Sequence, residues 1–354
     1  IVMDYKDING IYDLAKEKGL IYEKQDIYNF EFSLKTGRLV ILSGMSGVGK
    51  SKLVEIYAKA LNLDDASQSS KGIERGGLYK IIPVKASWSD DTDLVGYLDT
   101  INNLYRPSDN GLVKLLIEAE KNSNKKYIIC LDEMNLARAE YYFSDFLSIL
   151  EMENRILQLY NPTEKVYNTS EYPDNIKIGS NVYFIGTVNV DESTFRFSDK
   201  VLDRANVIRL EPCKFIKWYE LLENDNKNDG WDKNEILFLD ELNELLMKVD
   251  SQKGIGYRVV KQIIDYVKQI DSDNNLLNRS EAFDIQVVQR ILTKIRGTKD
   301  IIGSLIGCYD ELKGLYESSI LELCKKYNTV SEFNHVEKEL IRKSRELKNY
   351  EYTA

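Results

Sequence analysis

The residues best suited to chemistry form the stretch Gly44-Met-Ser-Gly-Val-Gly-Lys-Ser51, which follows the apolar run Leu39–Leu42 and precedes a helical pattern. The Gly-x-x-x-x-Gly-Lys-Ser spacing, between a strand and a helix, is that of a phosphate-binding P-loop. Its glycines leave the backbone open, so that several N–H groups can meet phosphate oxygens together. Lys50 supplies a cation to the β- and γ-phosphates, and the Ser51 hydroxyl is placed to ligate Mg²⁺. The predicted nucleotide-binding residues are Gly44, Met45, Ser46, Gly47, Val48, Gly49, Lys50 and Ser51.

A second motif, Tyr127-Ile-Ile-Cys-Leu-Asp132-Glu133, places two carboxylates directly after an apolar run. In parallel α/β sheets nucleotides bind at the carboxyl ends of strands, where this pair is expected. Asp132 would hold Mg²⁺, and Glu133 would polarise the attacking water. Adjacent carboxylates after a strand are by themselves more often a solvated turn. The P-loop favours the catalytic interpretation of this pair, because its Lys50 precedes Asp132 by 82 residues in the same chain.

Two further polar residues follow strand-like runs. Asn189 ends the run Val182–Val188 and could reach the γ-phosphate or the attacking water, although Asn at a strand end commonly begins a turn. Arg204 precedes the last apolar run and is either a surface ion pair or an arginine finger supplied to a neighbouring subunit, an effect worth about 10³–10⁵ in rate.

Composition restricts the class of protein. The 354 residues carry a net charge of −9, which excludes a globally basic nucleic-acid binder. No apolar run approaches the roughly 20 residues that span a bilayer, so no membrane association is expected. The four cysteines are widely spaced and there is a single histidine, which argues against a zinc site or disulfides and favours a cytoplasmic location.

The order of elements predicts an α/β fold with a five-stranded parallel sheet flanked by helices, followed by an all-helical subdomain. Pro212 is the last proline, and helical periodicity continues beyond it to about Tyr350. The predicted domains are a helical lead-in at 1–35, an α/β nucleotide-binding subdomain at 36–211 and a helical lid at 212–354. The predicted strands are Leu39–Leu42, Lys80–Val84, Tyr127–Leu131, Val182–Val188 and Val207–Leu210. The predicted helices are 8–18, 50–61, 111–122, 140–152, 214–224, 232–250, 256–271, 280–296, 300–325 and 332–348.

With these motifs in order, the chain resembles the AAA+ ATPases, and among them the McrB-like branch related to the MoxR group. Two segments of the second half add to the resemblance: Gly256-Tyr-Arg258 is similar to the sensor-2 segment, and 284–297 is similar to the McrB-type lid. The stretch 155–180 lies where this branch carries its pre-sensor-1 hairpin, with arms at 155–160 and 175–178. The other matching segments are 40–51, 88–96, 131–135 and 186–191.

The resemblance implies a homo-oligomeric ring, usually a hexamer, with GTP or ATP bound between subunits and Mg²⁺ held by Ser51 and Asp132. It assigns Asn189 as sensor 1, Arg204 as the finger and Arg258 as sensor 2, beside Glu133 as the catalytic carboxylate. Arg209 competes with Arg204 for the role of finger. The family's function would be to translocate DNA and to activate an McrC-like nuclease subunit in restriction.

Two departures from the McrB pattern leave the nucleotide and the DNA reader open. The signature after the sensor strand reads Asn189-Val-Asp-Glu192 instead of Asn-Thr-Ala-Asp, so GTP selectivity does not follow from it. No separate N-terminal DNA-reading domain is expected within these residues, so it was removed or another subunit reads the DNA.

Two other functions remain open. One is a MoxR-like chaperone ATPase that remodels protein complexes, which the segment Asp93-Leu-Val-Gly96 favours slightly. The other is an inactive module that binds nucleotide only to assemble. Trp88 is either a pore-facing aromatic or, more often for such a position, part of the core, while Lys85 and Arg106 are candidate pore cations or solvated side chains.

Overall fold

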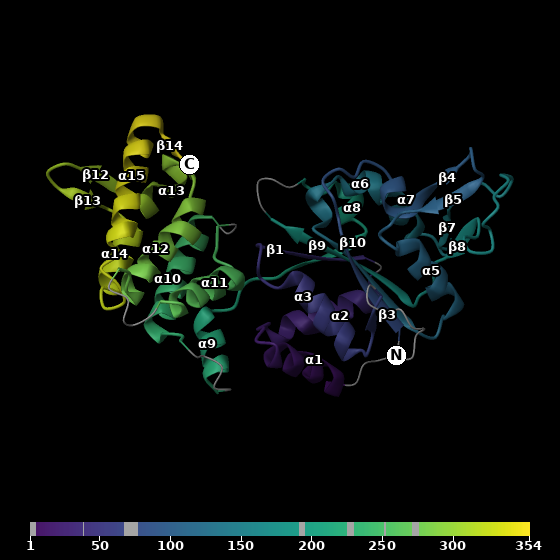
Figure 1. Ribbon diagram of the computed structural model, residues 1–354, viewed down its shortest axis with the longest axis horizontal. Helices are drawn as coiled ribbons and strands as arrows, with labels where there is room; N and C mark the ends of the chain where they lie inside the picture. The colour runs from purple at the N-terminus through teal and green to yellow at the C-terminus, as the bar shows by residue number, and fades with distance from the viewer. Residues whose placement is uncertain are drawn as a thin grey trace. The chain divides into compact units, whose positions relative to one another are not determined.

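The apolar runs between residues 39 and 210 form one sheet in the computed structural model (Figure 1). All strands of this sheet are parallel, in the order β10-β1-β9-β6-β3-β2. The structure describes residues 5–37, 39–66, 77–190, 195–224, 230–250, 253–270 and 276–354. The strands are β1 (Leu39–Gly44), β2 (Asp64–Asp65), β3 (Gly77–Pro83), β6 (Lys126–Asp132), β9 (Val182–Asn189) and β10 (Ala205–Arg209).

The five predicted strands are confirmed, and the strand number is corrected from five to six. The additional strand, β2, has two residues, both aspartates, and pairs with β3 at the sheet edge. It carries none of the β-branched or aromatic residues by which the sequence reveals a strand, so only pairing with β3 defines it.

The register of the sheet brings the predicted site residues to one edge. Gly44 at the end of β1 lies opposite Asn189 at the end of β9, and Asp132 at the end of β6 lies opposite Pro83 of β3. Because all strands run the same way, their carboxyl ends meet at this edge. The buried, apolar strands therefore place Gly44, Asp132 and Asn189 at the same edge of the sheet.

By contact clustering the chain divides into two units. We call the first the α/β unit; it comprises the described residues of Ile1–Lys18, Tyr22–Gly44 and Gly49–Leu210. We call the second the helical unit; it comprises those of Gly19–Ile21, Met45–Val48 and Glu211–Ala354. The tip of the P-loop, residues 45–48, thus groups with the helical unit.

Helices cover both sides of the sheet in the α/β unit. Figure 1 shows α1, α2 and α3 gathered on one side and α6, α7 and α8 on the other. The predicted helix at 140–152 was wrong as a single element, because the chain changes direction at Phe143 and forms α6 and α7. The helices are α1 (Tyr5–Glu17), α2 (Lys24–Thr36), α3 (Lys50–Ala60), α4 (Thr92–Val95), α5 (Leu112–Lys121), η1 (Met134–Leu136), α6 (Ala139–Tyr142), α7 (Ser144–Ile149) and α8 (Asp199–Leu202).

Two hairpins extend the α/β unit. Strands β7 (Ile156–Gln158) and β8 (Asn175–Lys177) are antiparallel, which confirms the predicted arms of the pre-sensor-1 hairpin. A second hairpin, β4 (Gly96–Asp99) and β5 (Leu104–Pro107), was not predicted. This hairpin begins at Gly96, the last residue of the segment 88–96. Trp88 in that segment is buried and packs edge-on against Tyr142. The core interpretation of Trp88 is therefore confirmed.

The helical unit contains the predicted helices with changed bounds, except that the predicted helix 300–325 is replaced by two helices. Its helices are α9 (Phe215–Asn224), α10 (Lys233–Val249), α11 (Tyr257–Lys268), α12 (Arg279–Arg290), η2 (Leu292–Lys294), α13 (Lys299–Ile306), α14 (Ser319–Lys326) and α15 (Asn334–Tyr350). Their apolar faces pack into one core that includes Phe238, Phe283 and Phe333. Within the described residues, no helix combines the length and apolar character needed to cross a lipid bilayer.

The predicted helical region is confirmed, but it is mainly helical rather than all helical. Strands β12 (Cys308–Asp310) and β13 (Gly314–Tyr316) form a hairpin between α13 and α14, and β11 (Gly297–Thr298) pairs with β14 (Tyr352–Thr353). Gly307 ends α13 at φ +82°, where an added Cβ would lie 2.5 Å from the Tyr316 carbonyl oxygen. A side chain there would clash, so this glycine stops the helix that periodicity predicts over 300–325.

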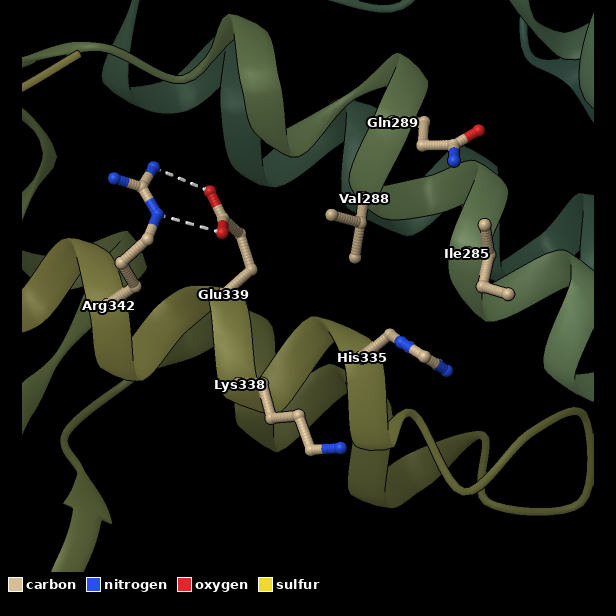
Figure 2. A pocket seen from close by; sticks show the side chains of 7 residues that line it. All are labelled: Ile285, Val288, Gln289, His335, Lys338, Glu339 and Arg342. Carbon is tan, nitrogen blue, oxygen red and sulfur yellow. Dashed lines mark hydrogen bonds and ion pairs between the residues drawn. The ribbon is translucent and has the colours of Figure 1, made fainter.

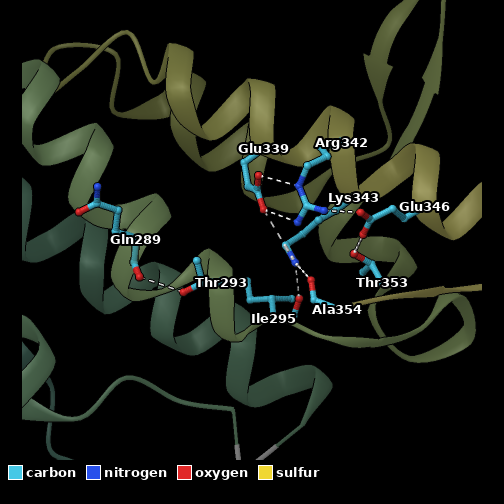
Figure 3. A network of polar contacts seen from close by, with 9 residues as sticks. All are labelled: Gln289, Thr293, Ile295, Glu339, Arg342, Lys343, Glu346, Thr353 and Ala354. Atoms are coloured by element: carbon cyan, nitrogen blue, oxygen red, sulfur yellow. Dashed lines mark hydrogen bonds and ion pairs between the residues drawn. The ribbon is translucent and has the colours of Figure 1, made fainter.

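A buried lysine organises the end of the helical unit (Figure 3). Lys343 on α15 has no exposed surface, and its Nζ donates to the backbone oxygens of Ile295, at 2.9 Å, and Ala354, at 2.8 Å. Around it, Glu339 and Glu346 pair with Arg342. The lysine therefore joins α15 to the residues just before β11 and just after β14 through charged hydrogen bonds.

Candidate functional site

The loop between β1 and α3 has the backbone of an anion-binding site. Gly47 and Gly49 lie at φ +85° and +96°, which favour glycine, so the chain turns sharply before α3 begins at Lys50. Lys50 is 6% exposed, and its Nζ donates to the Gly44 carbonyl oxygen at 2.9 Å. The N-terminus of α3 adds its dipole and its N–H groups at the same place. The loop can therefore hold phosphate oxygens beside a buried ammonium.

Ser51, Asp132 and Thr187 form a chain of short hydrogen bonds beside this loop. The Ser51 hydroxyl donates to Asp132 Oδ1 at 2.5 Å, and the Thr187 hydroxyl donates to the same oxygen at 2.6 Å. These three residues come from α3, β6 and β9. The sheet therefore brings together two residues, 51 and 132, that the sequence separates widely.

The oxygen atoms of Ser51 and Asp132 in this hydrogen-bond chain are suitable ligands for Mg²⁺. Magnesium prefers oxygen ligands and is usually held by one or two carboxylates together with substrate phosphates. Among the described residues, no group of three or more His, Cys, Asp or Glu is arranged to hold a metal by itself. One hydroxyl and one carboxylate, beside a phosphate loop, match a cation that takes its remaining ligands from nucleotide and water.

Glu133 lies next to this chain and is held from two directions. Its backbone is at φ +55°, its N–H donates to Thr187 Oγ1 at 2.9 Å, and its side chain is exposed. Asn189 Nδ2 donates to Glu133 Oε1 at 3.0 Å. A left-handed conformation is uncommon for Glu and is found where surrounding structure imposes it. The geometry thus brings the predicted sensor-1 asparagine to the predicted catalytic carboxylate.

Sequence reasoning missed two supporting residues. Thr187 bonds both the carboxylate of Asp132 and the backbone of Glu133, and Asn135 Nδ2 donates to the Asn189 carbonyl oxygen at 2.9 Å. Each lies two or three positions from a predicted site residue. A polar side chain inside an otherwise apolar strand, such as Thr187 in β9, was the available signal.

Arg204 is engaged within its own chain. Its Nε donates to the Leu147 carbonyl at 3.1 Å, its Nη1 to the Lys200 carbonyl at 2.6 Å, and its Nη2 to the Glu151 carboxylate at 2.8 Å. Its side chain is 19% exposed. Action on a neighbouring subunit would therefore require exchange of at least one of these bonds. The competing Arg209 lies on β10, opposite Ser43 of β1.

Within the helical unit, Arg258 approaches the tip of the P-loop. Its Nη2 donates to Ser46 Oγ at 2.7 Å. A Cβ on Gly256 would lie 2.5 Å from the Ser46 carbonyl oxygen, so a glycine is needed at this close approach. Burial lowers the pKa of Lys294, and the charges of Arg258 and Arg290 lower it further. Both arginines are thus close enough to repel Lys294, and a bound anion would relieve this repulsion.

Two surface grooves of the described residues do not lie at this site. One groove of about 380 Å³ lies between α12 and α15, where Figure 2 shows His335, Lys338 and Arg342 facing Ile285 and Val288. Its charged side chains pair locally, since Arg342 binds Glu339. It contains none of the predicted site residues. Asp191 and Glu192, on which the departure from the McrB signature rests, lie outside the described residues.

Comparison with known proteins agrees with this geometry. Residues 39–205, just under half of the chain, match the family described as AAA domain (dynein-related subfamily). Residues 210–352 match a domain of unknown function, DUF8727. The chain is 24% identical over 223 residues to the type IV methyl-directed restriction enzyme EcoKMcrB subunit of Escherichia coli (strain K12). That match covers 62% of this chain and 46% of the length of the relative.

The sheet, the phosphate loop and the paired carboxylates define the α/β unit as an AAA domain, which implies nucleotide hydrolysis. Both comparisons support a similarity to McrB-like AAA+ NTPases, and a mainly helical region follows the AAA domain.

Proposed function

We propose that the protein is an McrB-like motor that hydrolyses GTP or ATP in a ring assembly, translocates DNA and activates an McrC-like nuclease subunit in restriction. The observation that carries the catalytic part is the hydrogen-bond chain from Ser51 through Asp132 and Thr187 to Glu133 and Asn189. It joins the loop that would hold the phosphates to a carboxylate that could accept a proton. The motor part rests on the similarity to the EcoKMcrB subunit.

In this proposal each residue has a defined task. The P-loop N–H groups and Lys50 bind the β- and γ-phosphates, and Ser51 and Asp132 hold Mg²⁺, which neutralises charge on the phosphates when bound. Glu133 orients the attacking water and accepts its proton. Asn189 keeps the Glu133 carboxylate turned toward that water.

Arg258 and Arg204 would both contact a bound nucleotide, Arg258 from the subunit that binds it and Arg204 from a neighbouring subunit. Arg258, beside Ser46, would bind the terminal phosphates from the helical unit, which serves as the lid at 212–354. Arg204 would leave its internal partners and reach the nucleotide of the neighbouring subunit. The proposal includes a hexamer with nucleotide between subunits, and DNA and a nuclease partner in the assembled complex; these parts rest on the similarity to the EcoKMcrB subunit.

The deciding experiment is steady-state hydrolysis of GTP and ATP, measured side by side at rising protein concentration, for the wild type and Glu133→Gln. We expect the specific rate to rise with concentration, because a finger supplied in trans requires assembly. Glu133→Gln should lose at least about 100-fold in rate, the usual contribution of a general base, while still binding nucleotide.

Glu164→Gln, at a glutamate outside the hydrogen-bond chain, is the matched control and should keep the wild-type rate. Equal rates for Glu133→Gln and the wild type would overturn the catalytic assignment. A preference for GTP would support the restriction motor. A preference for ATP would favour the MoxR-like chaperone instead.

A further inference from the structure

Tyr22 touches the P-loop from a segment that the nucleotide motifs do not include. It lies between α1 and α2, is 5% exposed, and donates its hydroxyl to the Gly49 carbonyl oxygen at 2.8 Å. The same oxygen accepts the N–H of Leu53 at 2.8 Å, the first hydrogen bond of α3. One carbonyl at the start of α3 is therefore held by two donors, one from the helix and one from Tyr22.

The peptide group between Gly49 and Lys50 is planar and trans, so its carbonyl and its N–H point in opposite directions. A bond that fixes the Gly49 carbonyl therefore also fixes the direction of the Lys50 N–H. This N–H belongs to the first turn of α3, where helical N–H groups are free of intrahelical partners and available to an anion. Tyr22 thus contacts the side of this peptide group opposite to the Lys50 N–H, and it fixes the direction of that N–H through the planar peptide.

The contact also explains the glycine at position 49. A Cβ added there would lie 2.7 Å from the Tyr22 hydroxyl oxygen, and the residue is at φ +96°. The hydroxyl thus fills the space that another side chain would occupy. Burial raises the pKa of Tyr22, and the charge of Glu55 raises it further, so the hydroxyl keeps its proton and donates at neutral pH.

We propose that Tyr22 is a positioning residue of the phosphate site, which orients the Lys50 N–H toward the bound nucleotide by holding the Gly49 carbonyl. The inference rests on the proposed nucleotide-binding function of the P-loop. Tyr22 acts only on the backbone that meets phosphate, so its loss should affect GTP and ATP equally. A contact of Tyr22 with the base would instead change the ratio of the two affinities.

The test compares Tyr22→Phe with the wild type in binding of the non-hydrolysable β,γ-imido analogues of GTP and ATP. We expect both affinities to fall by about three- to tenfold, the value of one neutral hydrogen bond, with their ratio unchanged. Amide exchange of peptides that span residues 44–53 should become faster in the variant, in the absence of nucleotide.

Tyr105→Phe is the matched control. Tyr105 is equally buried in the α/β unit and donates its hydroxyl to a backbone carbonyl, that of Val95, at 2.5 Å. Both variants lose the same kind of bond, so a similar loss of thermal stability is expected, while only Tyr22→Phe should weaken nucleotide binding. Equal binding by the two variants, or a changed ratio of the GTP and ATP analogues, would overturn the positioning role.

Lys50→Ala separates failure of this inference from failure of the proposed function. If Lys50→Ala binds the analogues as tightly as the wild type, the P-loop is not the nucleotide site and the proposed function fails. If Lys50→Ala loses binding while Tyr22→Phe matches Tyr105→Phe, only the role of Tyr22 is refuted.

Discussion

Two buried lysines, one in each unit, show how differently this chain uses the same side chain. Lys343 in the helical unit donates to two backbone oxygens, with the Glu339 carboxylate at 4.0 Å, and its surroundings are fully closed. Lys50 in the α/β unit begins α3 directly after a glycine-containing loop, and the next residue, Ser51, donates to the Asp132 carboxylate. A buried charge enclosed by its own chain stabilises the fold, whereas a buried charge beside an open, glycine-containing backbone can serve a ligand.

Arg204 gives the strongest test of this difference between the lysines. It is bound within its own chain like Lys343, but it is predicted to act on nucleotide like Lys50. If it is the finger, Arg204→Ala should lower the hydrolysis rate by about 10³-fold. Mixing this variant with Glu133→Gln should restore activity, since each subunit supplies what its neighbour lacks. The measurement is the hydrolysis rate of the mixture against that of each variant alone.

Glu151→Gln controls for a structural role of the same ion pair. It removes the partner of Arg204 but leaves the arginine, so hydrolysis should persist. Equal loss of activity in Arg204→Ala and Glu151→Gln, without recovery on mixing, would mean that the arginine only stabilises the subunit and would direct attention to Arg209.

Substitution of each buried lysine by methionine tests the comparison directly. Lys50→Met should weaken triphosphate binding by at least about thirtyfold, because loss of a charged partner costs about 2–5 kcal/mol, with little change in stability. Lys343→Met leaves the Ile295 and Ala354 oxygens without their donor and should lower the free energy of unfolding of the helical unit by about 2–4 kcal/mol.

Urea unfolding followed by tryptophan fluorescence measures the second effect, since Trp218 and Trp231 both lie in the helical unit. Nucleotide affinity of Lys343→Met should equal that of the wild type. A loss of affinity in Lys343→Met without unfolding would mean that the closed network also serves the nucleotide site.

Asp284 provides a smaller test of the closed polar contacts in the helical unit. Its carboxylate accepts the backbone N–H groups of His335, at 2.7 Å, and Val336, at 2.9 Å, at the start of α15. Asp284→Asn replaces one acceptor oxygen with a donor and should lower the free energy of unfolding by about 1 kcal/mol. Urea unfolding at pH 4 and pH 7 measures this value.

The same variant has a pH dependence with a defined sign. Burial raises the pKa of Asp284, so the folded protein keeps this proton at a pH where the unfolded chain has lost it. The resulting stabilisation is fully present below the unfolded pKa of about 3.9 and is lost as the pH rises through the folded pKa. The stability difference between wild type and Asp284→Asn should therefore be larger at pH 4 than at pH 7; a difference that grows toward pH 7 would contradict this.

Lys294 should give the smallest effect. Arg258 and Arg290 repel it, so a triphosphate near Arg258 would relieve that repulsion. Lys294→Gln should weaken triphosphate binding by about threefold at low salt and less at high salt, because exposed charges are screened. Titration of the variant with a fluorescent GTP analogue at two salt concentrations measures this, and Lys261→Gln on α11 is the control. Equal affinities for the two variants at low salt would place Lys294 outside the site.

Much of the α/β unit could be predicted because its signals are local. Apolar runs such as Val182–Val188 are short, buried on both faces and separated by helical patterns, so strand and helix follow from the residues themselves. The P-loop and the pair Asp132 and Glu133 are equally local. Hydrophobic periodicity did not predict the end of α13, because a single residue, Gly307, stops the helix. It also did not predict β2, because only pairing with β3 defines that strand.

Local patterns were enough to predict which residues could meet a triphosphate, because glycine spacing, a lysine and strand-end carboxylates are recognised without knowledge of distant contacts. Other contacts became visible only in the folded chain: Thr187 joins Asp132 to Glu133, Tyr22 holds the Gly49 carbonyl, and Arg204 is bound within its own subunit. These contacts join residues from 27 to 55 positions apart. Such contacts depend on the register of the sheet and the packing of helices, which no local pattern encodes.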